Sequence, residues 1–195
     1  MIKTPKKREL VLPVPPQRVD VVIGIDPDAE KNGVAMLQRA DREIEAMALN
    51  FPDTLEYLRY AHAQSKTAGR TMRVVIEAGW LNKTHWHVGY RDSAQEAAAK
   101  GNSVGRNHET GRKIAEMCEY WQIPYELIKP LPLKAGGVNL WKGKDGKITA
   151  GELAAITGLG GRTNQEARDA ALIAWTWAGL PVSTRVKKIN QKIDF

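Results

Sequence analysis

Two uninterrupted apolar runs that each end in an acidic residue dominate the hydrophobic pattern of the chain. The first is Val21-Val22-Ile23-Gly24-Ile25 before Asp26, and the second is Val74-Val75-Ile76 before Glu77. Continuous runs of β-branched residues, rather than alternating ones, are typical of strands covered on both faces of a sheet. We therefore predict two central strands, over 20–26 and 73–77, each with a carboxylate at its end.

The rest of the pattern predicts shorter strands, helices and one long loop around these two runs. Lys31-Asn32-Gly33 has the composition of a hairpin turn. In chain order, the further predicted elements are strands over about 32–38 and 43–49, a helix over 53–66 capped by Asp53, a helical stretch over 93–121 interrupted at 101–105, a short strand over 123–128, a loop over 129–147, and helices over 149–158 and 163–179 that open with capping-box sequences.

This order of elements predicts an α/β fold. Three strands form an antiparallel meander, and two parallel strands complete a five-stranded mixed sheet flanked by helices. A chain of 195 residues with 43% hydrophobic composition suits one domain, which we place at residues 19–183. The single cysteine, Cys118, and the lack of a signal-peptide core or membrane-length apolar run favour a cytoplasmic protein without membrane attachment.

The net charge of +7 resides in the two ends of the chain. Residues 1–18 carry five basic residues against one acidic residue, and residues 184–195 carry four against one. The prolines among residues 1–18 predict an extended, flexible arm, and the last residues form a basic tail. Basic ends on a neutral body suit a polyanion such as nucleic acid, although basic ends also serve solubility.

The predicted topology brings four carboxylates together. Asp26 and Glu77 end adjacent parallel strands, roughly 5 Å apart, at the carboxyl edge where such sheets hold ligands. Glu166 and Asp169 are three residues apart on the last helix and project from one face. Clustered carboxylates repel one another unless cations lie between them, and oxygen ligands select magnesium or manganese. Two such ions about 4 Å apart hydrolyse phosphodiesters.

Each acid also has a structural explanation. Glu166 could be the third-position glutamate of a capping box, and Asp169 could interact with the helix dipole. Asp26, before Pro27, could be a turn residue. Glu77 has the weakest structural explanation, because it is a charged residue that ends an apolar strand. Taken together, the four acids favour a functional site.

The ordered acidic motifs resemble those of RuvC-type Holliday-junction resolvases, a family of the RNase H-like superfamily. The resemblance rests on segments in the family's order: Gly24-Ile25-Asp26-Pro27 with Gly33-Val34-Ala35, then Val75-Ile76-Glu77, then Ile128-Lys129-Pro130 through Lys134, then Glu166-Ala167-Arg168-Asp169-Ala170-Ala171-Leu172. Two positions depart from it. Asp28 stands where the family usually has glycine, and Glu166 stands where aspartate is common.

The resemblance implies an RNase H-like nuclease that cuts branched DNA as a homodimer, with Asp26, Glu77, Glu166 and Asp169 as catalytic ligands of two magnesium or manganese ions. Trp80 lies three residues after Glu77, where the family places an aromatic residue that stacks on bases near the branch point. An equally weighted alternative makes Trp80 a packing residue. Candidate phosphate contacts are Lys83, Lys129, Lys134 and Lys142.

Two further alternatives remain. A nuclease on the same scaffold could act on flaps or structured RNA, because a fold does not determine a substrate. The chain could instead be a DNA-binding module without catalytic activity, in which the acids are structural. A zinc site at His85, His87 and His108 is disfavoured, because these histidines lack cysteine partners and regular spacing.

Overall fold

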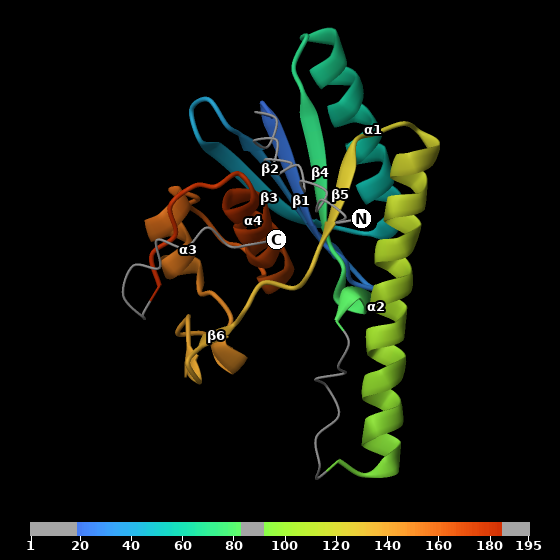
Figure 1. The fold of residues 1–195 in the computed structure, drawn as a ribbon, viewed down its shortest axis with the longest axis vertical. Helices are drawn as coiled ribbons and strands as arrows, with labels where there is room; N and C mark the ends of the chain where they lie inside the picture. Colours follow the sequence, from blue (N-terminus) through green and yellow to red (C-terminus); the bar gives the residue numbers. More distant parts are fainter. Residues whose placement is uncertain (1–18, 83–91, 185–195) are drawn as a thin grey trace, which may run out of the picture.

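The computed structural model describes residues 19–82 and 92–184. A five-stranded sheet at the centre of the molecule has the strand order β3-β2-β1-β4-β5 (Figure 1). Its strands are β1 (Val21–Asp26), β2 (Asn32–Gln38), β3 (Glu43–Leu49), β4 (Met72–Glu77) and β5 (Tyr125–Ile128). The pairs β1–β2 and β2–β3 are antiparallel, while β1–β4 and β4–β5 are parallel. This topology confirms the predicted five-stranded mixed sheet, with an antiparallel meander of three strands and two parallel strands.

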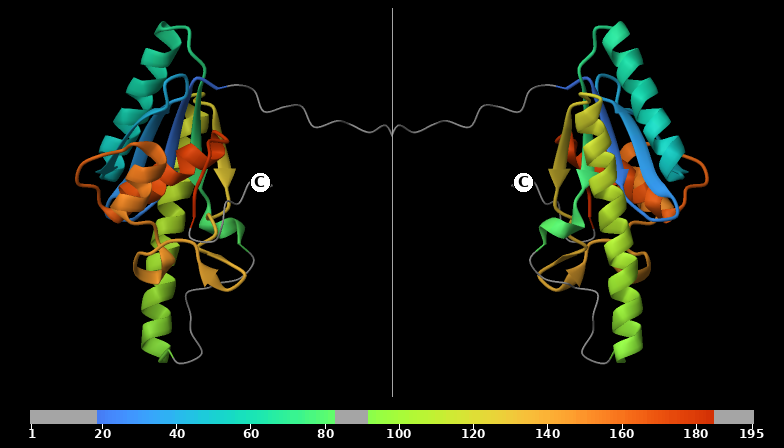
Figure 2. Two further views of the ribbon diagram at one scale, coloured as in Figure 1. Left: turned by 90° about the vertical axis from the view of Figure 1, so that its left-hand side faces the viewer. Right: turned by 90° about the vertical axis from the view of Figure 1, so that its right-hand side faces the viewer.

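Helices cover both faces of the sheet (Figures 1 and 2). α1 (Phe51–Thr67) and α2 (Ala94–Tyr120) lie on one face, and α3 (Ala150–Thr157) and α4 (Gln165–Trp177) lie on the other. Ile23 and Val74 pack in the core under α1 and α2, whereas their neighbours Val22 and Val75 pack in the core under α4. Burial on both faces explains why the two central strands are continuously apolar. None of the helices in these ranges is both long and apolar enough to cross a bilayer.

Three expected features differ in the structure. α2 is continuous through Gly101 and Gly105, because glycine weakens a helix by only about 1 kcal/mol and leaves its backbone hydrogen bonds intact. The N-cap of α1 is Asn50, whose side chain accepts a hydrogen bond from the N–H of Asp53. The segment expected to be a structureless loop over 129–147 contains a short hairpin, β6 (Lys134–Ala135) with β7 (Val138–Asn139), and a 3₁₀ turn, η2 (Lys144–Gly146).

The start of α4 also differs from the expected capping box. Asn164 is the N-cap residue, and its side-chain oxygen accepts a hydrogen bond from the N–H of Ala167 at 3.0 Å. Glu166 therefore lies one position too early to close a capping box. The structural explanation that the sequence offers for this acid is wrong. By contrast, the expected capping box of α3 is present, between Thr149 and Glu152.

Candidate active site

Asp26 and Glu77 are the last residues of two adjacent parallel strands. β1 and β4 run in register, and the pair Ile25 and Ile76 lies one residue before the two acids. Both acidic residues are half-buried, whereas Ile25 and Ile76 directly before them are completely buried. The sheet thus holds the two carboxylates side by side at its carboxyl edge, as the sequence predicted.

Two glycines allow α4 to approach this edge closely. A side chain at Gly24 of β1 would overlap the backbone of Ala170, and a side chain at Gly33 of β2 would overlap the carbonyl of Glu166. Gly33 is also the residue paired with Asp26 across the β1–β2 ladder. The backbone of Glu166 therefore packs directly on the strand residue next to Asp26.

The electrostatic coupling of the acids shows that α4 brings its carboxylates to the same place. The pKa of Asp26 is well above its ordinary value, because the group is buried and because Glu77, Asp169 and Glu166 place negative charge around it. Burial and the charge of Asp169 raise the pKa of Glu77 to about 7, although the backbone N–H of Leu131 opposes that shift. All four predicted acids belong to one coupled group. Their function as ligands stays a prediction.

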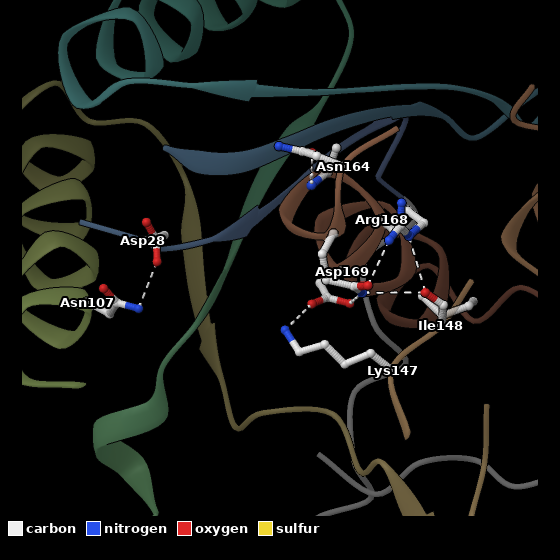
Figure 3. Close-up of polar contacts among 9 residues, drawn as sticks. Asp28, Asn107, Lys147, Ile148, Asn164, Arg168 and Asp169 are labelled. Atoms are coloured by element: carbon white, nitrogen blue, oxygen red, sulfur yellow. Dashed lines mark hydrogen bonds and ion pairs between the residues drawn. The ribbon is translucent and has the colours of Figure 1, made fainter. Parts of the chain in front are cut away.

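Lys147 adds a positive charge to the four acids. Its Nζ lies 2.8 Å from Oδ2 of Asp169 (Figure 3). The charges of Asp26 and Glu77 also act on this half-buried ammonium group. Burial lowers the pKa of Lys147, but the nearby carboxylates outweigh burial and raise it overall. No pattern in the sequence separates this residue from the other lysines near it. The only signal for it was the number of lysines in the segment 129–147.

Hydrogen bonds to α4 hold the segment after Lys147 in position. The Arg168 guanidinium donates to the carbonyl oxygens of Ile148 and Thr163 and to Oε1 of Gln165 (Figure 3). Nε2 of Gln165 in turn donates to Oδ1 of Asp169 at 2.7 Å. Asp169 therefore receives a hydrogen bond on one oxygen and an ammonium group on the other, and its carboxylate has a defined orientation.

Trp80 lies in η1 (Gly79–Leu81), directly after the Glu77 strand, and packs against α2. A side chain at Gly111 would overlap its ring, the Arg112 guanidinium carbon lies 5.3 Å from the ring centroid, and the His108 ring meets it edge-on at 5.9 Å. The tryptophan is half-buried. The ring is therefore docked on a helix while part of it stays exposed, and stacking on DNA remains a prediction.

The other predicted contacts are spread around the site. Lys129 follows β5, Lys134 lies in β6, and Lys142 follows β7; all three side chains are exposed. Lys83, His85 and His87 lie outside the described residues, as do residues 1–18 and most of the C-terminal tail. The His108 ring makes an edge contact with the Trp80 ring and packs against Gly79.

The four carboxylates have the chemistry of a site for hard cations, because they are all-oxygen donors whose mutual repulsion a cation would relieve. Within residues 19–82 and 92–184, no group of three or more His, Cys, Asp or Glu side chains is arranged to hold a metal ion. The cation that lies among the acids is the Lys147 ammonium. The donor set thus fits a divalent ion in chemistry, and the predicted pair of ions remains a prediction.

Comparisons with known proteins give a match among solved structures. No family model matches the chain, and no curated protein matches it. The chain is similar to the RuvC of T. thermophilus in complex with a Holliday junction substrate, with 16% identity, a TM-score of 0.45, and coverage of 80% of this chain and 91% of that chain. It is also similar to a second Thermus thermophilus RuvC structure, with 16% identity, a TM-score of 0.38, and coverage of 82% and 97%.

Proposed function

We propose that this protein is a metal-dependent, structure-selective endodeoxyribonuclease that cuts Holliday junctions or other branched DNA. The observation that carries the proposal is the convergence of four acids from three separate segments at one edge of the sheet, where β1 and β4 end side by side and α4 packs closely on β1 and β2. Unfavourable burial of so many carboxylates reduces folding stability, so a site of this kind indicates function more than structure.

Asp26, Glu77, Glu166 and Asp169 would hold two magnesium or manganese ions. Bound there, the ions would activate a water and stabilise the negative charge on the leaving oxygen of a phosphodiester. The protein's own part is to aim the carboxylates. The register of β1 and β4 fixes the positions of Asp26 and Glu77, while hydrogen bonds from Gln165 and Lys147 orient the carboxylate of Asp169. The raised pKa of Glu77, about 7, means that this carboxyl is partly protonated near neutral pH, so binding of a cation there would release protons.

The positive charge of Lys147 suits a role on the phosphate. Its Nζ reaches the acids from the segment directly after η2, so a scissile phosphate at the carboxylates would meet an ammonium donor there. Lys129, Lys134 and Lys142 would contact phosphates further along the strand. Trp80 would stack on a base exposed at the branch point.

Two other assignments use the same observations. The acids would serve equally well in a nuclease for flaps or structured RNA, and a DNA-binding module could retain them without catalysis.

We propose a homodimer for the junction nuclease, because two-fold symmetry would present two sites to paired strands. We also assign residues 1–18 and 184–195 as basic arms on a nuclease domain at 19–183.

One experiment separates these assignments. A synthetic four-way junction, a flap, a duplex and a hairpin RNA are incubated with the protein, with and without magnesium, and the products are resolved by size. Cleavage of the junction above the other substrates, only with the metal, supports the proposal. Faster cleavage of the flap or the RNA than of the junction supports the alternative nuclease function. Binding without cleavage of any substrate supports the DNA-binding module.

A further inference from the structure

The turn between β1 and β2 is organised by Asp28, two residues after Asp26. Oδ1 of Asp28 accepts hydrogen bonds from the N–H of Glu30 at 2.8 Å and the N–H of Lys31 at 3.3 Å. The N–H of Asp28 itself donates to Oδ1 of the fully buried Asn32 at 3.1 Å. Asp28 therefore closes the turn locally with one carboxylate oxygen.

The second oxygen of Asp28 reaches a helix far along the chain. Nδ2 of Asn107, on α2, donates to Oδ2 of Asp28 at 3.0 Å, and Oδ1 of Asn107 accepts from the N–H of Ala29 at 3.0 Å (Figure 3). Both oxygens of Asp28 are thus occupied by N–H donors. The bonds of this carboxylate join the turn after β1 to α2, which makes Asp28 a structural link between the two.

The same part of α2 also contacts the residues that follow the two strand acids. One turn after Asn107, a side chain at Gly111 would overlap both the ring of Trp80 and Pro27, which follows Asp26. His108 meets the edge of the Trp80 ring. A single face of α2 therefore spans from the turn after Asp26 to the tryptophan after Glu77.

These contacts lie near the middle of α2, where its buried half begins. Its buried residues are Gly111, Ile114, Ala115 and Cys118, all in its C-terminal half. The N-terminal half extends past the end of the sheet (Figures 1 and 2). The Asp28–Asn107 pair lies where the helix leaves the sheet, so it is well placed to set the angle at which the helix holds Trp80.

We infer that Asp28 and Asn107 form a positioning pair that fixes α2, and with it Trp80, relative to Asp26. This inference rests on the proposed function for its effect on cleavage, but not for its effect on structure. It also gives a physical role to the aspartate at a position where the resembling family usually has glycine. Sites that hold reacting groups tolerate little displacement, and a shift of about 1 Å costs up to ~100-fold in rate.

The test is a reciprocal exchange of the two side chains. Asn107→Asp places two carboxylates face to face, and Asp28→Asn places two amide groups where one donor and one acceptor are needed. The double variant Asp28→Asn/Asn107→Asp restores the bond between the two side chains with donor and acceptor reversed, and it keeps an acceptor for the N–H groups of Ala29, Glu30 and Lys31. In that variant the amide nitrogen at position 28 donates to the carboxylate at position 107, while the amide oxygen at position 28 still closes the turn. Glu116→Gln is the matched control, since it breaks the exposed Lys113–Glu116 pair on the same helix.

Two measurements are made on each variant at a temperature where circular dichroism shows it folded. The first is the ¹⁹F spectrum of protein labelled with 5-fluorotryptophan, in which the Trp80 resonance is assigned from Trp80→Phe. The second is single-turnover cleavage of a four-way junction with magnesium, beside junction affinity in calcium. We expect each single variant to move the Trp80 resonance and to cut about 10-fold more slowly with affinity retained. The exchange and the Glu116→Gln control should match the parent.

The results decide between positioning and other roles. An unmoved Trp80 resonance in both single variants, or an exchange variant that stays as impaired as they are, overturns the inference. If the Trp80 resonance moves but the cleavage rate equals that of the parent, the pair does not affect the reaction, and that part of the inference is wrong. If Asn107→Asp does not fold, Asn107→Ala removes both hydrogen bonds without adding charge and takes its place. A parent protein that cuts nothing refutes the proposed function, and the ¹⁹F resonance alone then decides whether the pair positions Trp80.

Discussion

Nζ of Lys147 lies 2.8 Å from Oδ2 of Asp169, so an ammonium group lies within the cluster of four acids. The two residues come from different elements, the segment after η2 and the first turns of α4. Their ion pair offsets part of the repulsion that raises the pKa of Asp26 and of Glu77. The lysine therefore belongs to the candidate active site as much as the acids do.

Lys147→Met should slow junction cleavage by about 100-fold at saturating magnesium, because it removes one charged donor from the place where negative charge develops. Magnesium should bind more tightly to this variant, since a competing cation is gone. Single-turnover rates and a magnesium titration measure the two effects. Lys144→Met, an exposed residue three positions earlier, is the control and should behave as the parent does. Parental rates in Lys147→Met would make the ion pair structural.

Asp26→Asn should abolish cleavage and leave junction binding unchanged or tighter. The change would remove a proposed metal ligand but no proposed phosphate contact. Cleavage on a gel and affinity in calcium give the two readouts. Asp53→Asn, an exposed acid in the first turn of α1, is the matched control. Cleavage at the parental rate by Asp26→Asn would refute the assignment of the site.

The stability of the metal-free protein should fall as pH rises from about 4.5 to about 7. The folded-state pKa of Glu77 is raised from 4.5 to about 7, so the folded protein binds this proton more tightly than the unfolded chain does. The resulting stabilisation is complete below the unfolded pKa and is lost as pH rises through the folded pKa. The loss is on the order of 3 kcal/mol.

Thermal unfolding at several pH values tests this slope, with Glu77→Gln as the comparison. The glutamine variant should show a flatter profile, and magnesium should raise the melting temperature of the parent more at pH 8 than at pH 5. Parallel profiles for the parent and Glu77→Gln would show that Glu77 does not carry the proton.

Patterns within single elements predict the sheet and the four acids. Asp26 and Glu77 end apolar runs, and the spacing of Glu166 and Asp169 on one helix follows from the residues per turn. Lys147 could not be distinguished from its neighbours, because its position depends on hydrogen bonds between Arg168 of α4 and the carbonyl of Ile148. The link from Asn107 to Asp28 spans 79 residues, and no local pattern reports such a contact. Contacts between residues far apart in the chain, which form only when the elements pack together, could not be predicted from the sequence.

Gly33→Ala should destabilise the fold by about 3 kcal/mol and reduce cleavage further, because a methyl group would push Glu166 of α4 away from the strand that pairs with Asp26. Gly101→Ala is the control. Its methyl group would point into open space on a helix, and it should stabilise the protein by up to about 1 kcal/mol. Denaturant unfolding and cleavage assays at equal folded fraction check both effects. A harmless Gly33→Ala would mean that α4 does not need this close approach.

Trp80→Ala should slow junction cleavage well beyond its effect on binding, with the fold retained by circular dichroism. The half-buried ring lies on α2 beside Gly111 and the Arg112 guanidinium, so its orientation is set before DNA arrives. A junction exposes unstacked bases that a duplex lacks, and stacking on an aromatic ring contributes about 1 to 3 kcal/mol per base. The ring would thereby help to place the phosphate at the acids.

Two comparisons separate stacking from packing at Trp80. Trp80→Phe keeps an aromatic face and should retain most of the cleavage, whereas Trp80→Leu keeps apolar volume against Gly111 without a face for stacking. Leucine should therefore cut as slowly as alanine. If leucine restores the parental rate, the ring acts only by packing against α2, and the selectivity for branched DNA must come from another part of the surface.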